Sequence, residues 1–130
     1  MPRSAEEQQR LDRTLEMYRK VLIAMDKTHV DEFLSPDYIQ HSSLAEPGIP
    51  ALKAWLDKVR VESPDARQTI HRAFVDGDFV VVHVHVVRWP GDPGFAVADF
   101  FRWEGDRIIE HWDVLQEVLA DGGINPNGMF

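Results

Sequence analysis

The sequence predicts an α+β fold in which N-terminal helices pack on a strongly curved antiparallel meander sheet and enclose a cone-shaped pocket. Apolar residues recur at helical spacing in the first half of the chain, and strand-like runs separated by short turns follow from Arg67 onward. Because helices and strands are segregated along the chain, the helices are expected to cover one face of the sheet. The 130 residues are expected to form a single domain over 1–130.

Each element has a local signal. Ser4 and Glu7 form a capping box before the first helix, Pro36 ends the second, and Pro50 suits the first turn of the third. Helices are therefore expected over 5–26, 29–34 and 50–62, with a short extended piece over 37–41. Four strands are expected over 68–75, 79–89, 95–103 and 108–117, because glycine- and aspartate-containing turns separate these runs.

Composition excludes several classes of function. The net charge is −8 and the 14 basic residues are scattered, so neither nucleic acid nor an anionic membrane surface is an expected partner. Cysteine is absent, which excludes disulfides, thiolate catalysis and cysteine-ligated zinc. The N-terminus lacks an apolar signal region and no apolar run approaches the ~20 residues of a membrane span, so a cytoplasmic location is expected.

The last two predicted strands carry ionisable residues inside apolar runs, which is unusual unless the groups are paired or functional. His111 and Asp113 are two residues apart and share a face of their strand. A two-residue turn would set Asp99 across from Trp112, on the other face. A three-residue loop with a left-handed Asp106 would set Asp99 across from His111, and we favour this register.

In the favoured register, Asp99, His111 and Asp113 form a candidate acid–base group, framed on the same face by apolar residues that include Phe101. His41 lies beside a loop that could cap the mouth of the cavity, and it is the fourth candidate catalytic residue. The expected substrate pocket adds Tyr18 and Trp55 from the helices and the H-x-H pair, His83 and His85, from the second strand. A structural ion pair and ordinary core packing are the alternatives.

Aromatic residues are also expected on the opposite side of the sheet. In the favoured register, Phe100 and Trp112 lie on the outer face, and an exposed aromatic face usually marks a partner surface. We therefore expect a symmetric homodimer through the sheet.

The segment Asp99–Gln116 has the pattern D-x-F-R-x-E-x-x-x-I-x-E-H-W-D-x-x-Q, and Y-I-Q-H, V-H-V-H and N-G-M-F occur at 38–41, 82–85 and 127–130. This combination resembles the SnoaL-like branch of the nuclear-transport-factor-2-like superfamily. The resemblance implies a cystatin-like α+β barrel with a deep pocket and frequent dimers. It also implies cofactor-free chemistry, in which an acidic residue, here Asp99 or Asp113, removes a proton alpha to a carbonyl.

Three functions are therefore considered. The first is a cofactor-independent lyase or isomerase of the polyketide cyclase or aldol type, acting on an apolar or carbonyl-containing small molecule. The second is a non-catalytic ligand-binding or dimeric assembly module of the same fold. The third, and least favoured, is a metalloprotein with His83, His85 and His111 as ligands; no metal site is otherwise expected.

Overall fold

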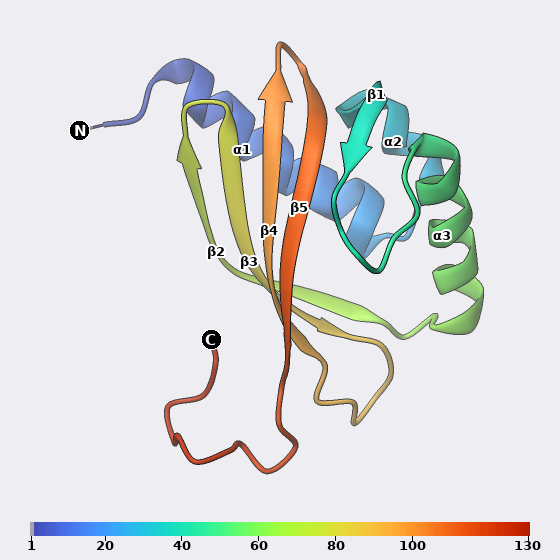
Figure 1. The fold of residues 1–130 in the computed structure, drawn as a ribbon, viewed down its shortest axis with the longest axis vertical. Coiled ribbons are helices and arrows are strands. Elements are labelled where there is room, and N and C mark those ends of the chain that lie inside the picture. The colour runs from blue at the N-terminus through green and yellow to red at the C-terminus, as the bar shows by residue number, and fades with distance from the viewer. Residues whose placement is uncertain (1) are drawn as a thin grey trace.

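The computed structural model describes residues 2–130 as helices packed on one face of a curved five-stranded sheet (Figure 1). The helical elements are α1 (Ala5–Met17), η1 (Tyr18–Ile23), η2 (Lys27–His29), α2 (Val30–Phe33) and α3 (Ile49–Glu62). The strands are β1 (Leu34–Gln40), β2 (Arg67–Asp76), β3 (Phe79–Val87), β4 (Phe95–Glu104) and β5 (Arg107–Glu117). Helices precede the four-strand meander, which confirms the predicted α+β fold.

The first helix begins at the predicted capping box. The Ser4 hydroxyl accepts from the Glu7 backbone N–H at 3.1 Å, and the Glu7 carboxylate accepts from the Ser4 N–H at 2.9 Å. The helix does not run as an α-helix to residue 26 as predicted, because its last six residues form the π-helix η1. π-Helical segments are rare and often lie at functional sites. Here η1 begins at Tyr18, which is fully buried against the sheet.

The boundary between the second helix and the first strand differs from the prediction. The strand β1 begins at Leu34 and includes Pro36, whereas the extended piece was expected to start at residue 37. Pro36 is tolerated because β1 is an edge strand, where a missing N–H removes no essential ladder bond.

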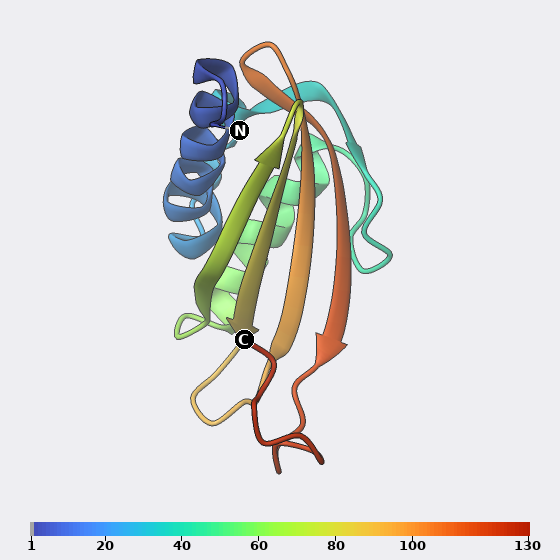
Figure 2. The same ribbon diagram turned by 90° about the vertical axis from the view of Figure 1, so that its left-hand side faces the viewer.

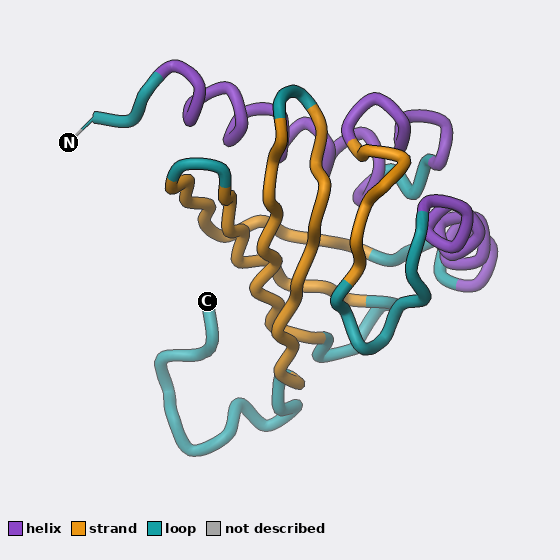
Figure 3. The backbone as a smooth tube through the Cα atoms, turned by 45° about the horizontal axis from the view of Figure 1, so that its top comes forward, coloured by secondary structure: helices purple, strands orange, loops and turns teal. Residues whose placement is uncertain are grey.

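The sheet has the order β1-β5-β4-β3-β2. Strands β2 to β5 form the predicted antiparallel meander, but β1 pairs with β5 in parallel, so the sheet is mixed rather than wholly antiparallel. The side view in Figure 2 shows α1 lying along one face, and Figure 3 shows how strongly the strands bend across the molecule. The parallel pairing brings Gln40 opposite His111.

Alternation along the strands separates an inner from an outer face. On β3, Val80, Val82 and Val84 are fully buried beneath the helices, while their neighbours His83 and His85 face outward. The C-terminal residues fold back onto this outer face, where the Phe130 ring lies 4.5 Å from the rings of His71 and His85. Within residues 2–130, no helix is long and apolar enough to span a membrane.

Candidate acid–base site

The β4–β5 hairpin determines which ionisable residues meet. Glu104 pairs with Arg107 across a two-residue turn, with Gly105 in the left-handed region at φ 58°. The predicted three-residue loop with a left-handed Asp106 is therefore wrong. A bulge between Arg102 and Trp103 then shifts the pairing, so that Asp99 faces Asp113 and not His111.

The bulge keeps all three acid–base residues on the inner face. It places the unpaired extra residue, Ile109, between two inward-facing positions, Ile108 and His111. A two-residue turn without a bulge would have sent Asp99 to the face opposite His111. Asp99, His111 and Asp113 thus share a face as predicted, but a two-residue turn combined with a bulge places them there.

Asp99 lies at the centre of a buried hydrogen-bond network. Its Oδ1 lies 2.8 Å from His111 Nε2, and its Oδ2 accepts from the Tyr18 hydroxyl. Asp99 and His111 are each 8% exposed. The network joins side chains from β4, β5 and the π-helix η1. Its hydrogen bond between Tyr18 and Asp99 links residues that are 81 positions apart in the sequence.

The other ring nitrogen of His111 fixes the tautomer. His111 Nδ1 lies 2.7 Å from Gln40 Oε1. The same oxygen accepts from the backbone N–H of Ser42 at 3.0 Å, and since a backbone N–H can only donate, this atom is the amide oxygen rather than the nitrogen. His111 Nδ1 therefore carries a proton and donates it to Gln40.

A second proton lies between His111 and Asp99. A 2.8 Å separation of a ring nitrogen and a carboxylate oxygen is a hydrogen bond only if one proton lies between them. The pair is then either an imidazolium with a carboxylate or a neutral imidazole with a carboxylic acid. Both forms are electrically neutral overall, so the proton can move between His111 and Asp99 without changing the net charge of the pair.

Asp113 differs from Asp99 in its surroundings. Its carboxylate lies within 4.8 Å of the nearest ligand atoms of Asp99 and His111. Among residues 2–130 it has no hydrogen-bond or ion-pair partner, and it is half-buried. Its oxygens are thus free to meet a ligand, whereas both oxygens of Asp99 are already engaged.

Two tyrosines border these carboxylates. Burial, and then the charge of Asp99, raises the pKa of Tyr18 well above its usual value. Burial, followed by the charges of Asp99 and Asp113, likewise raises the pKa of Tyr38, although a hydrogen bond from Gln40 opposes the shift. Both hydroxyls therefore remain protonated at neutral pH, and each has a proton with which it can donate a hydrogen bond.

Aromatic packing fixes the orientation of the network. The Phe101 ring stacks on the His111 ring with centroids 4.8 Å apart, and the Tyr18 ring meets Phe101 edge-on at 5.8 Å. Of the predicted pocket residues, Tyr18 and Phe101 thus lie against the acid–base group.

His41 does not join this group. It follows Gln40 directly, and adjacent residues of a strand point to opposite faces. Its ring stacks on Trp112 at 4.8 Å on the outer face, and its Nε2 lies 2.6 Å from Glu110 Oε2. We therefore leave His41 out of the candidate catalytic group.

His83 and His85 also lie outside the inner face, contrary to the predicted pocket. His83 contacts Arg72 through Nδ1, and His85 Nε2 lies 2.7 Å from the carbonyl oxygen of Pro93. Burial, and then the Arg72 charge, lowers the pKa of His83. Because His111 faces inward and the other two histidines face outward, the three ligands of the least favoured hypothesis, a metalloprotein, do not meet. The alternating valines of β3 indicated this orientation in the sequence, because a strand that turned its histidines inward would have exposed its valines to solvent.

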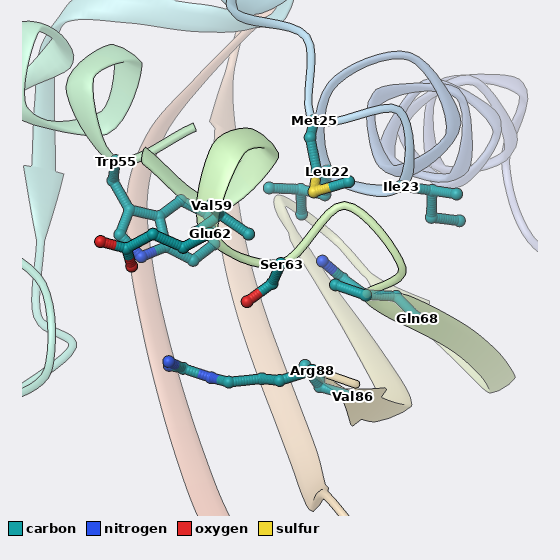
Figure 4. A pocket seen from close by; sticks show the side chains of 11 residues that line it. Leu22, Ile23, Met25, Trp55, Val59, Glu62, Ser63, Gln68, Val86 and Arg88 are labelled. Atoms are coloured by element: carbon teal, nitrogen blue, oxygen red, sulfur yellow. The ribbon is translucent and has the colours of Figure 1, made fainter. Parts of the chain in front are cut away.

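Trp55 lines a separate cleft between the end of α3, η1 and the ends of β2 and β3 (Figure 4). Trp55 is 40% exposed, and the lining includes Leu22, Val59 and Arg88 but none of the acid–base residues. The predicted contribution of Trp55 to the acid–base pocket is therefore not observed.

Asp99, His111 and Asp113 offer ligand atoms within 4.8 Å of one another, a spacing that can suit a divalent cation. However, His111 Nε2 and both oxygens of Asp99 already form hydrogen bonds within the protein. Two of the three donor residues are therefore already engaged by protein partners, and we derive no metal chemistry from this group.

Sequence reasoning did not assign roles to two residues of the network, Tyr38 and Gln40. Their spacing of two places them on one face of β1 and His41 on the other. The missing information was the parallel pairing of β1 with β5, which brings Gln40 to His111.

The outer-face cluster predicts a pH-dependent contribution to stability. The hydrogen bond from His41, and then those from Arg102, lower the pKa of Glu110. A lowered carboxyl pKa stabilises the folded state above the unfolded value of about 4.3, and this stabilisation is lost as the pH falls through the folded value. Glu110→Gln should therefore lower the melting temperature at pH 7, with the difference from wild type shrinking below about pH 4.3.

Thermal melting of both proteins from pH 7 to pH 3 measures this difference. Glu117→Gln is the matched control, because Glu117 lies exposed on the same strand. Equal melting curves for Glu110→Gln and Glu117→Gln at pH 7 would contradict the prediction.

Comparison with known proteins places this chain and its fold in a family. The family model for the SnoaL-like domain matches residues 15–111. No curated protein sequence gives a significant match. A proposed SnoaL-like polyketide cyclase from Jannaschia sp. CCS1 is similar in structure, with TM-score 0.74 and 18% identity over 88% of this chain and 90% of that one.

Two other solved structures are also similar. A proposed polyketide cyclase from Acidithiobacillus ferrooxidans has TM-score 0.67 and 21% identity, covering 88% of this chain and 91% of that one. AclR, a proposed hydroxylase from Streptomyces galilaeus, has TM-score 0.70 and 19% identity, covering 93% and 89%. At such identities the structures establish the fold and not the reaction. The family match and the shared fold together show that the chain belongs to the SnoaL-like family, whose solved relatives include proposed polyketide cyclases.

Proposed function

We propose that this protein is a cofactor-independent lyase or isomerase that removes a proton from the carbon next to a carbonyl group. The observation that carries the proposal is the free carboxylate of Asp113 beside the proton-sharing pair of Asp99 and His111. A general base needs an unengaged oxygen, and a neighbouring group that holds a proton can return it to the product.

The reaction is balanced without a cofactor. Asp113 takes the α-proton, the C–H electron pair forms a C=C bond, and the carbonyl π electrons move to oxygen to give an enolate. In an isomerase, the proton returns to another carbon of the same molecule. In an aldol-type cyclisation, the enolate carbon attacks a second carbonyl, whose oxygen takes the proton. His111 orients the network and can deliver its shared proton.

Exchange of hydrogen for deuterium tests the proposal before the full reaction is known. Polycyclic ketones and small β-keto acids are incubated with the protein in D₂O, and loss of the α-proton signal is followed by NMR. The wild-type protein should exchange at least one compound class faster than buffer alone. Exchange at the buffer rate across the whole panel would overturn the proposal.

The same residues also support a second candidate, a non-catalytic binding module. Both oxygens of Asp99 and both nitrogens of His111 are satisfied within the protein, as in a structural ion pair. This candidate predicts that a ligand raises the melting temperature of the wild type and of Asp99→Asn equally, with no exchange in either protein.

We further propose that the protein is a symmetric homodimer through the outer face of the sheet. One outward row crosses four strands in register and is apolar throughout: Phe74, Val81, Phe100 and Trp112. Phe74 is 60% exposed, and the next row adds Val114 at 64%. Exposed apolar patches of this kind commonly mark interfaces between proteins.

Val114→Arg should convert the dimer to a monomer, because it introduces a charge that the interface would bury without a partner. Molar mass by light scattering after gel filtration measures this change. Val61→Arg is the matched control, since Val61 is 82% exposed but lies on α3, away from the sheet face. A monomeric wild type, or a Val114→Arg variant that stays dimeric, would contradict the proposed interface.

A further inference from the structure

We infer that the Tyr38 hydroxyl forms a binding subsite for the carbonyl oxygen of the substrate and for the enolate oxygen derived from it, and that Gln40 orients this hydroxyl. The inference rests on the proposed function, because it assigns the place of the carbonyl relative to the base Asp113. It names a substrate class, compounds whose reacting C–H and oxygen can reach Asp113 and Tyr38 together.

The direction of the hydrogen bonds leaves the Tyr38 proton free. The amide oxygen of Gln40 is fixed by the Ser42 N–H, so the amide nitrogen of Gln40 faces Tyr38. That nitrogen can only donate, and it lies 2.7 Å from the Tyr38 oxygen. Tyr38 is thus an acceptor in this bond, and its own O–H donates to no described residue.

The location of Tyr38 suits an oxygen ligand. The side chain is 7% exposed, on the same inner face as Gln40, and the charges of Asp99 and Asp113 both influence it. A buried O–H donor without an acceptor favours an oxygen atom that enters the site. An N–H bond from Gln40 polarises the hydroxyl and makes it a stronger donor to a developing negative charge.

Tyr18 does not have this freedom. Its hydroxyl already donates to Asp99, so its proton is committed within the protein. The two tyrosines of the chain therefore have separate roles: Tyr18 supports the Asp99–His111 pair, and Tyr38 meets the ligand. Gln40 links both, because its oxygen orients His111 and its nitrogen orients Tyr38.

The probe for this subsite is 4-nitrophenol, whose phenolate oxygen imitates an enolate and whose absorption distinguishes the bound anion from the bound phenol. The titration is made in the Asp113→Asn variant, since the amide imitates the carboxyl group after it has taken the substrate proton. The control ligand is 4-nitroanisole, in which a methyl group prevents formation of the anion. The Asp113→Asn protein should bind the phenolate more tightly than the ether.

Adding Tyr38→Phe should weaken phenolate binding by about ten-fold or more, the usual loss of a hydrogen bond to a charged group, and leave 4-nitroanisole unaffected. Adding Gln40→Glu keeps the acceptor for His111 but offers Tyr38 a carboxylate, which turns the Tyr38 proton away from the ligand. Gln40→Glu should therefore weaken phenolate binding to the same extent. A merely structural role of Gln40 would weaken binding of 4-nitroanisole as well, whereas loss of the Tyr38 hydrogen bond weakens binding of the phenolate alone.

Circular dichroism checks that each variant is folded, and the Gln40→Glu variant keeps the inference testable if Tyr38→Phe does not fold. Unchanged phenolate affinity in the folded variants, or equal affinity for phenolate and ether in the starting protein, would overturn the subsite. This outcome is distinct from failure of the proposed function, which is measured by proton exchange in the protein with Asp113 intact. Exchange without a Tyr38 effect removes only the subsite. A Tyr38 effect without exchange retains the subsite and removes the catalysis.

Discussion

Asp113→Asn is expected to lower the rate of α-proton exchange by roughly 10²- to 10⁴-fold, the usual contribution of a general base. The amide is nearly isosteric with the carboxylate but has no basic oxygen. Because Asp113 has no partner among residues 2–130, its replacement leaves no buried group unsatisfied. The exchange rate should therefore fall while the melting temperature changes little. NMR exchange and thermal melting of the same samples measure both quantities.

Asp99→Asn is the informative comparison for this experiment. Asp99 is hydrogen-bonded to both Tyr18 and His111, so its replacement disturbs two partners. It should therefore lower the stability of the fold as well as the rate of α-proton exchange. If exchange persists in Asp113→Asn and disappears in a stable Asp99→Asn protein, the base is Asp99 and our assignment is wrong. If both variants exchange like the wild type, neither aspartate is the base.

Trp103→Ala is expected to destabilise the protein by roughly 3–5 kcal/mol, the range measured for large aromatic residues in cores. Trp103 is 2% exposed, and its indole N–H donates to the Thr14 hydroxyl at 2.9 Å. That hydroxyl donates in turn to the Arg10 carbonyl at 2.7 Å, so the indole joins β4 to α1. Urea denaturation at fixed protein concentration measures the loss, because a dimer would make stability depend on concentration.

Two variants separate the parts of this effect. Trp103→Phe keeps most of the ring volume but loses the N–H, so it should cost less than Trp103→Ala. Trp89→Ala is the matched control, because Trp89 is 57% exposed and should change stability by no more than about 0.5 kcal/mol. A loss below about 1 kcal/mol in Trp103→Ala would show that the indole is not the junction between helix and sheet that the structure indicates.

The order of elements could be predicted because its signals are local. The capping box at Ser4, the proline at the start of α3 and the turns between β2 and β5 each act over a few residues. The boundaries of β1 and the π-helix were not predicted, since both depend on how the segments pack against the sheet. Tyr18 illustrates this point: its helical spacing was visible in the sequence, but its bond to Asp99 joins residues 81 apart.

Local alternation also determined part of the candidate site. A spacing of two places His111 and Asp113 on one face, whatever the rest of the chain does. The tertiary structure decided which residues join them, because a turn, a bulge and a parallel edge strand set the pairing. It excluded His83, His85 and His41 because burial of the valine face of β3 and the inward turn of Gln40 direct these histidines outward. The sequence by itself thus determined the residue types and which residues of one strand share a face. Only non-local packing decided which face is buried and which side chains meet there.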